Sequence, residues 1–341
     1  MIIKNITSKK ILASMGDETI EAMINDTFTA SVPAGISAGK YEIKKVSADE
    51  AIRQIGQIGQ ICIGKDWTQE SLDAEISAHN FGGNSTLAVS AAFYKIDSIG
   101  RSAPSRMTKL PKLMLLLFEG GEHGNKNITI QEFMVVEDSL VQAIKDFRTM
   151  REYLEDNLIE KTVGAEGGFS PLKFTNHDVL ETIKKVLPDK QISVDMAECF
   201  GESQIPEGVF SVEDPFNDED WSNWINLTNL NKYLVIGDDL TTTNPERIKK
   251  AIELKACNGV VIKPNQIGTI TAAKEAAKLT HDNNLKVIVS HRGQETDDTW
   301  IVDFALDVEA DYVKFGGMDR GERIAKYNRL LELLPSGSQN S

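Results

Sequence analysis

The segment QISVD at residues 191–195 is the first of six short apolar runs in the C-terminal half of the chain. The others are VFSVED (209–214), YLVIGDD (233–239), GVVIKPN (259–265), KVIVSHR (286–292) and YVKFGG (312–317). Each run is rich in β-branched residues, which favours a strand. Helix-start signals lie between them, at Asn244 followed by Pro245 and at Thr269. Strands that alternate with helices predict a parallel sheet built from βα units.

Each predicted strand ends in a charged or titratable group. These groups are Asp195, Glu213, Asp238, Lys263, His291 with Arg292, and Lys314, and successive ones are 18 to 28 residues apart. Parallel strands that close into a barrel bring their C-terminal ends to one face, where barrel enzymes carry their catalytic residues. The pattern therefore predicts an α/β barrel with these groups at one opening. A single charged strand end is as well explained by simple solvation, but six in succession favour a site.

Three of these groups are carboxylates, and three carboxylates at one opening repel one another unless a cation lies among them. Asp195, Glu213 and Asp238 are therefore candidate metal ligands. A ligand set made only of oxygen atoms favours a hard ion such as Mg²⁺.

Lys263 follows the apolar residues Val260, Val261 and Ile262, so its ammonium group is expected to be partly desolvated. Burial and neighbouring cations both lower a lysine pKa, which makes Lys263 a candidate general base. The alternative is a structural lysine that is paired with a carboxylate. Arg292 offers a planar group suited to phosphate or carboxylate. A base, a metal and an anion clamp together fit proton abstraction beside a carboxylate.

The composition excludes several classes of function. Lysine and arginine number 37 against 51 aspartates and glutamates, which gives a formal net charge of −14. Such an acidic chain is a poor candidate for binding nucleic acid or an anionic membrane. The three cysteines, Cys62, Cys199 and Cys257, are far apart and form no metal-binding motif. We expect a cytoplasmic protein, because no apolar stretch is long enough to cross a bilayer.

The first hundred residues predict a separate α+β unit. Thr19–Val32 is expected to be extended, Ser47 with Glu50 has capping-box spacing, and Asn84–Asp97 is expected to form a buried helix. The basic, proline-containing stretch 100–112 marks a boundary. We therefore expect a lid domain over residues 1–103 and a barrel domain over residues 108–341.

Two further segments carry candidate site residues. TVGAEGGFSP (162–171) holds Glu166 before two glycines, and EGGEHGNKNITIQEFM (119–134) holds His123, Gln131 and Glu132. An isolated glutamate or histidine is more often structural than functional. The loop PAGISAGKYE (33–42) contains glycines and could fold over a site as a lid.

At these residues the chain resembles the enolase (phosphopyruvate hydratase) family. The resemblance extends from about Ile11 to Leu333. It is carried by SVPAGISAGKYE, GGNSTLAVSAA, EGGEHGNKNITIQEFM, VGAEGG, SVDMAE, VEDPF, IGDDLTTTNPERI, IKPNQIGT, VSHRGQETDD and GERIAKYNRLL, in the family's order.

The resemblance implies an enolase-type (βα)8 barrel with a small N-terminal α+β domain, usually in a homo-oligomer. It implies the reversible dehydration of 2-phosphoglycerate to phosphoenolpyruvate, a step of glycolysis and gluconeogenesis, with two Mg²⁺ ions per site. By match to the family's motifs, Lys263 would take the C2 proton, and Glu166, supported by Glu132, would assist loss of the C3 hydroxyl. The first Mg²⁺ would be held by Asp195, Glu213 and Asp238, and Ser37 would help to bind the second together with substrate. The pocket would be completed by Lys314 on the substrate carboxylate, Arg292 on the phosphate, and His123, His291 and Gln131.

Several positions depart from the family's pattern. Gly293 stands where the family has a serine that contacts phosphate, and Ala165 replaces the aspartate before the catalytic glutamate. The lid sequence lacks two hydroxyls beside Ser37. Only 17 residues separate Asp195 from Glu213, so the helix between them is expected to be rudimentary. These changes leave open an enolase-like paralogue that acts on a related phospho- or phosphono-carboxylate.

A third alternative is a hydrolase, because Gly35–Gly39 matches the GxSxG pattern around Ser37. That motif requires a strand, a sharp turn and then a helix. The segment that follows, KYEIKKV, is more typical of extended structure, which argues against this alternative.

Overall fold

The computed structural model describes residues 1–35, 39–98, 110–197 and 204–334. The N-terminal part contains an antiparallel sheet of β1 (Ile6–Leu12), β2 (Glu18–Ile24) and β3 (Phe28–Ser31). A 3-10 turn, η1 (Ser14–Gly16), joins the first two strands. Helices α1 (Ala48–Cys62), α2 (Gln69–Ser77) and α3 (Gly83–Ser98) follow, with α1 and α3 packed on the sheet. The extended segment predicted at 19–32 is therefore a hairpin, which turns at residues 25 and 26 with positive φ angles.

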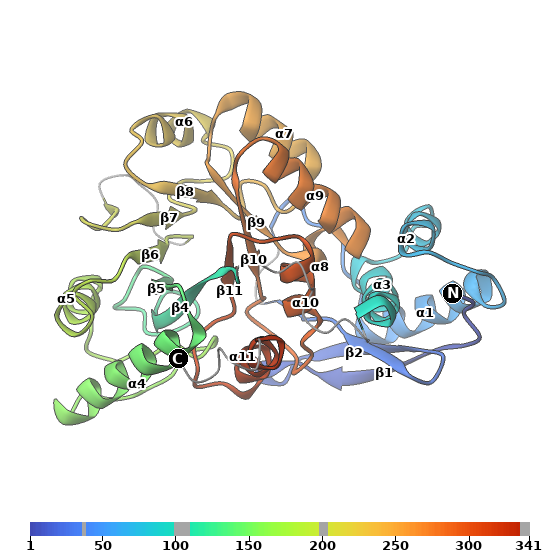
Figure 1. The fold of residues 1–341 in the computed structure, drawn as a ribbon, viewed down its shortest axis with the longest axis horizontal. Helices are drawn as coiled ribbons and strands as arrows, with labels where there is room; N and C mark the ends of the chain where they lie inside the picture. The colour runs from blue at the N-terminus through green and yellow to red at the C-terminus, as the bar shows by residue number, and fades with distance from the viewer. Residues whose placement is uncertain (36–38, 99–109, 198–203, 335–341) are drawn as a thin grey trace.

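The larger part is a closed eight-stranded barrel, which confirms the predicted fold class (Figure 1). Its strands follow the order β10-β11-β4-β5-β6-β7-β8-β9. They are β4 (Lys112–Glu119), β5 (Glu132–Glu137), β6 (Ile192–Asp195), β7 (Ser211–Glu213), β8 (Leu234–Gly237), β9 (Gly259–Ile262), β10 (Lys286–Ser290) and β11 (Tyr312–Lys314). The six runs identified in the sequence are β6 to β11, and all six are parallel to their neighbours among them.

One strand runs against the others, a feature that the sequence pattern did not predict. Strand β5 is antiparallel to both β4 and β6. Its first residue, Glu132, therefore lies opposite Asp195, the last residue of β6. The reversed strand thus places its N-terminal end at the rim that carries the C-terminal ends of the other strands.

Helices surround the barrel: α4 (Leu140–Asp156), α5 (Asn176–Val186), α6 (Trp221–Asn229), α7 (Pro245–Leu254), α8 (Pro264–Ile267), α9 (Ile270–Asp282), α10 (Trp300–Asp307) and α11 (Gly321–Leu333). The predicted helix starts are confirmed, because Asn244 caps α7 and Thr269 caps α9 through their side chains. Ser47 caps α1 in the same way. In the described part of the connection between β6 and β7, residues 196–197 and 204–210, there is no α-helix.

The core has two layers. Inside the barrel, buried side chains of alternate strand residues pack together, among them Met114, Leu116, Met134, Val261 and Ile288. A larger apolar cluster lies between the barrel and its helices and continues into the N-terminal sheet. Side chains therefore fill the lower barrel, which leaves only the rim open to a ligand.

The N-terminal sheet and helices lie against one side of the barrel (Figure 1). Side chains of α2 and α3 bind the start of α9: Ile270 N donates to Ser90 Oγ at 2.9 Å, and Thr271 N donates to Asp73 Oδ2 at 2.9 Å. Thr86 Oγ1 also donates to Gly268 O at 2.8 Å. The predicted boundary between residues 103 and 108 lies outside the described residues, so the division into two domains stays a prediction.

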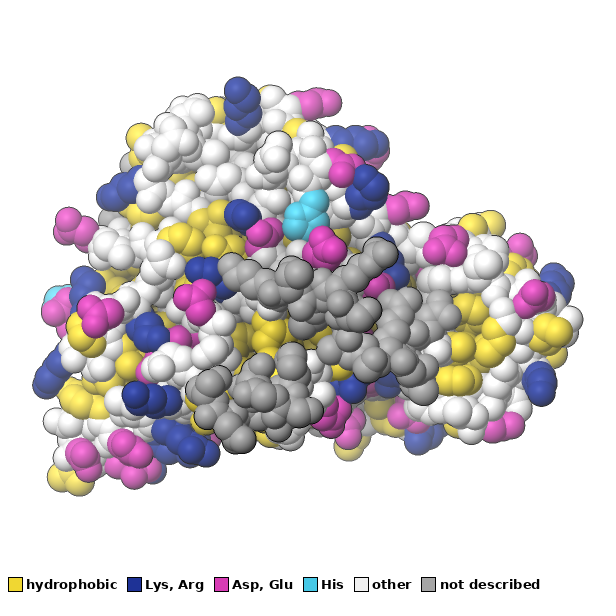
Figure 2. All heavy atoms as spheres, in the orientation of Figure 1, with side chains coloured by type: hydrophobic (Ala, Val, Ile, Leu, Met, Phe, Trp, Pro, Cys, Tyr) yellow, Lys and Arg dark blue, Asp and Glu magenta, His cyan; other side chains and the backbone are white. Residues whose placement is uncertain are grey.

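Two surface properties bear on function. Figure 2 shows acidic and basic side chains intermixed over the described part of the visible face. Among the described residues, no helix combines the length and the apolar character needed to cross a bilayer.

Candidate active site

A pocket of about 130 Å³ lies at the rim where the strand ends meet. It brings together most of the residues singled out in the sequence: His123, Gln131, Glu132, Glu166, Asp195, Asp238, Lys263, His291, Arg292, Gly293 and Lys314. Glu213 is buried beside them and contacts Lys314. Ser37, which was assigned to the second metal and to substrate, lies outside the described residues.

Lys314 is the centre of a buried ion cluster. Its Nζ lies 2.9 Å from Asp195 Oδ2, 2.8 Å from Glu213 Oε1 and 3.0 Å from Glu132 Oε2. Burial alone would lower the pKa of Lys314, but the three carboxylates outweigh it and hold that pKa well above the usual range. Burial and the nearby Asp195 raise the pKa of Glu213 to about 8, although Lys314 acts against them. The cluster therefore keeps the ammonium charged.

Lys263 corrects one prediction. The sequence suggested that its pKa would be lowered, and burial does act in that direction. The Lys263 ammonium, however, contacts the Asp238 carboxylate directly, so the pKa of Lys263 is raised. Arg292 and Lys314 act in the lowering direction but are outweighed. In this state Lys263 is a charged acid, and it must lose a proton before it can act as a base.

Asp238 is held at a sharp turn after β8. Asp214 accepts hydrogen bonds from the backbone N–H groups of Asp238 and Asp239, at 3.1 and 2.8 Å. Gln266 Nε2 donates to Asp238 Oδ1 at 3.1 Å. Asp214 therefore has a structural task, since both its carboxylate oxygens are engaged in shaping the turn that presents Asp238 to the pocket.

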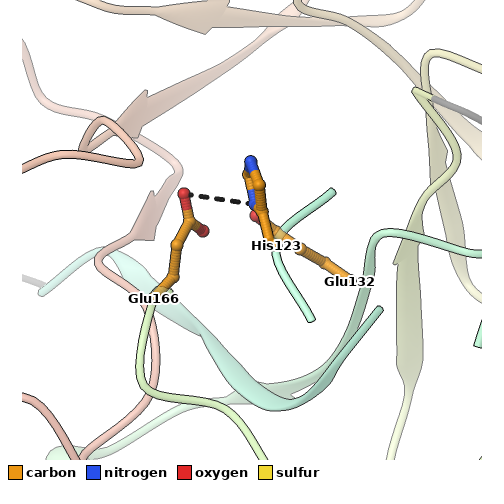
Figure 3. A group of neighbouring side chains, drawn as sticks. All are labelled: His123, Glu132 and Glu166. Atoms are coloured by element: carbon orange, nitrogen blue, oxygen red, sulfur yellow. Dashed lines mark ion pairs between the residues drawn. The ribbon is translucent and has the colours of Figure 1, made fainter. Parts of the chain in front are cut away.

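A second group of titratable side chains lines the same pocket, where His123, Glu132 and Glu166 converge (Figure 3). Glu166 Oε1 lies 3.5 Å from His123 Nδ1, and its Oε2 lies 3.3 Å from His291 Nε2. Burial lowers the pKa of His291 to about 4, so this imidazole is neutral near pH 7.

The pKa values of the two glutamates of this group are shifted in opposite directions. Burial raises the pKa of Glu132 well above its usual range, with Glu166 adding to the effect. Burial acts on Glu166 in the same direction, but His291 and His123 prevail and bring the pKa of Glu166 well below its usual range. Two buried carboxyls this close cannot both ionise easily. Of the two, Glu132 is therefore the one that more readily binds a proton.

Arg292 has a carboxylate partner from the N-terminal part of the chain. Its Nη1 and Nη2 donate to the two oxygens of Glu42 at 3.1 and 3.0 Å. The backbone of this arginine is fixed by Arg323, which is fully buried and donates to the carbonyls of Arg292 and Gly293 at 3.1 and 2.7 Å. The described ends of the predicted lid loop also reach the rim, since Ala34 N donates to Gln294 O at 2.9 Å.

The charge of the pocket tests whether a metal ion fits. Among the described residues that line it, eight are acidic and only Lys263, Arg292 and Lys314 are permanent cations. Glu166 Oε2 is buried without a hydrogen-bond donor in the described part of the chain. An excess of buried carboxylates is stable only if they take up protons or a cation. The donors are oxygen atoms, so they fit a hard divalent ion such as Mg²⁺.

The choice of ligands within this set stays a prediction. In the described chain, two groups of three side chains have ligand atoms within 4.8 Å of one another: His123 with Glu132 and Glu166, and Asp214 with Asp238 and Asp239. The predicted ligands Asp195 and Glu213 belong to neither group, because both turn toward Lys314. Asp238 is shared between the predicted set and the second group.

Among the residues that the sequence did not single out are Glu42, which lines the pocket, and Glu119 and Arg323, which contact residues of the site. Glu119 follows the apolar run Leu113–Phe118, so the rule that located the other strand-end charges applies to it as well. Glu42 and Arg323 have no such signal, because their partners are distant in the sequence.

Comparison with known proteins agrees with the family resemblance of the sequence motifs. The family model described as "Enolase, C-terminal TIM barrel domain" matches residues 107–202 and 188–336. An enolase of Elusimicrobium minutum (strain Pei191) is 29% identical, and the comparison covers 97% of this chain and 95% of that protein. Because this family model matches well over half of the chain, the chain belongs to the enolase family.

Proposed function

We propose that this protein is a Mg²⁺-dependent lyase that interconverts 2-phosphoglycerate and phosphoenolpyruvate. One observation carries the proposal: an amine, Lys263, and two carboxyl groups, Glu132 and Glu166, line a single acidic pocket that also presents Arg292 and Lys314. A dehydration needs a base on one side of the substrate and an acid on the other.

Lys263 is the proposed base for the C2 proton. The residue directly follows β9 and is the N-cap of α8, and its backbone N–H donates to Thr243 Oγ1 at 2.9 Å. Asp238 favours the charged form of Lys263. Whatever neutralises the Asp238 carboxylate therefore favours release of a proton by Lys263 and prepares it to accept one from substrate.

Glu166 is the proposed acid for loss of the C3 hydroxyl. We propose that Glu166 receives the proton that it needs from Glu132, whose pKa is raised, while His123 Nδ1 and His291 Nε2 lie 3.5 and 3.3 Å from its two oxygens. Proton transfer to the departing hydroxyl converts a poor leaving group into water. Gln131 and His291 line the same space and are available to the substrate's oxygen atoms.

The anionic groups of the substrate require cations. We propose that Asp195, Glu213 and Asp238 hold Mg²⁺, which when bound supplies positive charge to stabilise the negative charge that develops on the substrate carboxylate. Lys314 lies among these residues and would contact the same carboxylate. Arg292 would receive the phosphate, because a guanidinium group binds phosphate oxygens in pairs.

A second candidate is an enolase-like paralogue that acts on a related phospho- or phosphono-carboxylate. It is favoured by Gly293, which lines the pocket and offers no hydroxyl to a phosphate, and by Ala165 beside Glu166. In this proposal both changes affect how substrate is recognised, whereas the base Lys263 and the three proposed metal-binding carboxylates are retained.

The setting of the protein is part of the proposal. A cytoplasmic location agrees with the two described cysteines, Cys62 and Cys257, both of which are buried free thiols. We also propose a homo-oligomer, by likeness to the family.

A direct assay of phosphoenolpyruvate formation tests the proposal. The protein would be incubated with 2-phosphoglycerate in the presence of Mg²⁺ and, separately, of a chelator. We expect turnover that depends on Mg²⁺. If the protein bound Mg²⁺ but formed no detectable phosphoenolpyruvate, the result would support the paralogue instead. Phosphono-carboxylates would then be the next substrates to assay.

A further inference from the structure

Glu119, the last residue of β4, occupies an unusual place behind the proposed acid. A β-bulge between Leu116 and Phe118 shifts the register of β4 against β5, so that Glu119 lies opposite Glu132. Leu116 and Met134, which are also paired, face the barrel interior. The bulge therefore turns Glu119 to the interior side on which Glu132 lies.

The Glu119 carboxylate binds the backbone of the segment that carries Glu166. Its Oε2 accepts the N–H of Glu166 at 3.0 Å and its Oε1 accepts the N–H of Gly168 at 2.7 Å. The side chain is fully buried. A Cβ atom on Gly164 would lie 2.2 Å from Glu119 Cδ, so the carboxylate packs directly on a backbone that has no side chain there.

Other contacts hold the rest of the segment, since Gly164 N donates to Gly168 O at 3.0 Å and Ala165 N donates to His123 O at 2.8 Å. The N–H groups of Glu166 and Gly168 are the ones that donate to Glu119. Residues 164–168 read GAEGG, and Gly167 adopts a φ of +91°, in the region that favours glycine. Ala165 offers no polar side chain. A carboxylate that accepts two N–H groups of one turn is the kind of contact that fixes such a loop.

We propose that Glu119 is a positioning residue for Glu166: by accepting the N–H groups of Glu166 and Gly168 it fixes the 164–168 backbone and thereby the place of the Glu166 carboxyl in the pocket. The effect on the reaction rests on the proposed function, whereas the hold on the backbone does not.

The charged neighbours of Glu119 place its carboxyl beside Glu132 and Glu166. Glu166 comes from the bound segment, Glu132 from β5 and Arg323 from α11, and His123, on the connection that follows β4, contacts Glu166. Burial, together with the charge of Glu166, raises the pKa of Glu119 to about 8, while the two backbone N–H groups and Arg323 act in the opposite direction. Ionisation of Glu119 therefore brings a further negative charge beside these two carboxyls.

The backbone contact is tested first, in the wild-type protein and without substrate. The amide signals of Glu166 and Gly168 would be followed by NMR as the pH is raised. Both should be protected from hydrogen exchange, and both should shift together with a midpoint near pH 8. Two amides that exchange freely would overturn the proposal.

The Glu119→Gln variant tests the same contact by removal. An amide side chain can accept only one of the two N–H groups and turns its own donors toward the other. We expect hydrogen exchange to become about tenfold faster at one or both amides, as loss of one buried hydrogen bond implies. Glu137→Gln is the matched control, because Glu137 is equally buried and lies at the other end of the β4–β5 ladder. Unchanged protection in Glu119→Gln, or an equal loss in the control, counts against the contact.

Kinetics then test the link to the reaction. With 2-phosphoglycerate and Mg²⁺, Glu119→Gln should slow phosphoenolpyruvate formation by about tenfold or more, while exchange of the C2 proton with solvent, the step assigned to Lys263, stays within about twofold. An equal fall in both steps would refute a specific effect on Glu166. If the wild-type protein forms no phosphoenolpyruvate, the proposed function fails, and the amide measurements still decide the role of Glu119.

Discussion

Replacement of Lys314 by methionine tests whether the Lys314 ammonium offsets the negative charge of the carboxylates in the pocket. The Lys314 ammonium is 3% exposed and contacts Asp195, Glu213 and Glu132 at 2.8–3.0 Å. Methionine has a similar length and fills the same space without charge. The change therefore leaves three buried carboxylates with no ammonium between them.

The expected cost follows from this geometry. Removal of one partner from a buried ion pair destabilises a protein by about 3–5 kcal/mol, because an uncompensated charge remains. Glu132 and Glu213 already have raised pKa values and can take up protons, which limits the loss. We therefore expect Lys314→Met to lower the free energy of unfolding by about 3 kcal/mol at neutral pH in the presence of a chelator.

Urea denaturation measures this difference. The wild-type protein and Lys314→Met would be unfolded at neutral pH, first with a chelator and then with Mg²⁺, which should stabilise the variant more than the wild type. Lys278→Met is the control, because Lys278 forms an exposed pair with Asp282 that is worth at most about 1 kcal/mol. If Lys314→Met cost no more than this control in chelator, the balance of charge described here would be wrong.

Three further predictions concern single groups. Lys263→Ala should abolish exchange of the C2 proton with solvent and leave Mg²⁺ binding largely intact, as NMR and calorimetry would show; retained exchange would exclude Lys263 as the base. Asp238→Asn should weaken Mg²⁺ affinity in the same calorimetric titration, and an unchanged affinity would remove Asp238 from the ligand set. Burial, with Asp146 adding to it and Lys190 opposing it, raises the pKa of Glu137 from 4.5 to about 7, so its contribution to stability is complete below about pH 4.5 and is lost as the pH rises through 7. Glu137→Gln should remove that part of the decline in unfolding free energy between pH 4.5 and 7, and identical pH profiles for the two proteins would contradict this assignment.

Much of the barrel could be predicted because its signals are local. Each of the six strands from β6 to β11 is a short apolar run that ends in a charged or titratable group, and the barrel topology then gathers those groups at one rim. The direction of β5 could not be predicted in this way. Its residues Glu132–Glu137 are all buried, so the segment shows no alternation of apolar and polar residues. Nothing in its local pattern indicates the direction of the strand in the barrel.

The balance of charge in the pocket depends on contacts that no local pattern contains. The sequence shows that Lys263 follows apolar residues, which led to a wrong prediction for its pKa, because the contact with Asp238 lies 25 residues away. Arg292 meets Glu42 across 250 residues. Glu119 ends an apolar run like the other strand-end charges, but only the bulge in β4 determines that it faces Glu132.

The central claim is that acidic side chains at the barrel rim bind a divalent ion close to Lys263. The most direct measurement is anomalous diffraction from a crystal that contains Mn²⁺ in place of Mg²⁺. The account predicts an anomalous peak coordinated by Asp195, Glu213 and Asp238. A peak between Asp214, Asp238 and Asp239 would contradict the assigned ligands, and the absence of any peak in this pocket would contradict the claim itself.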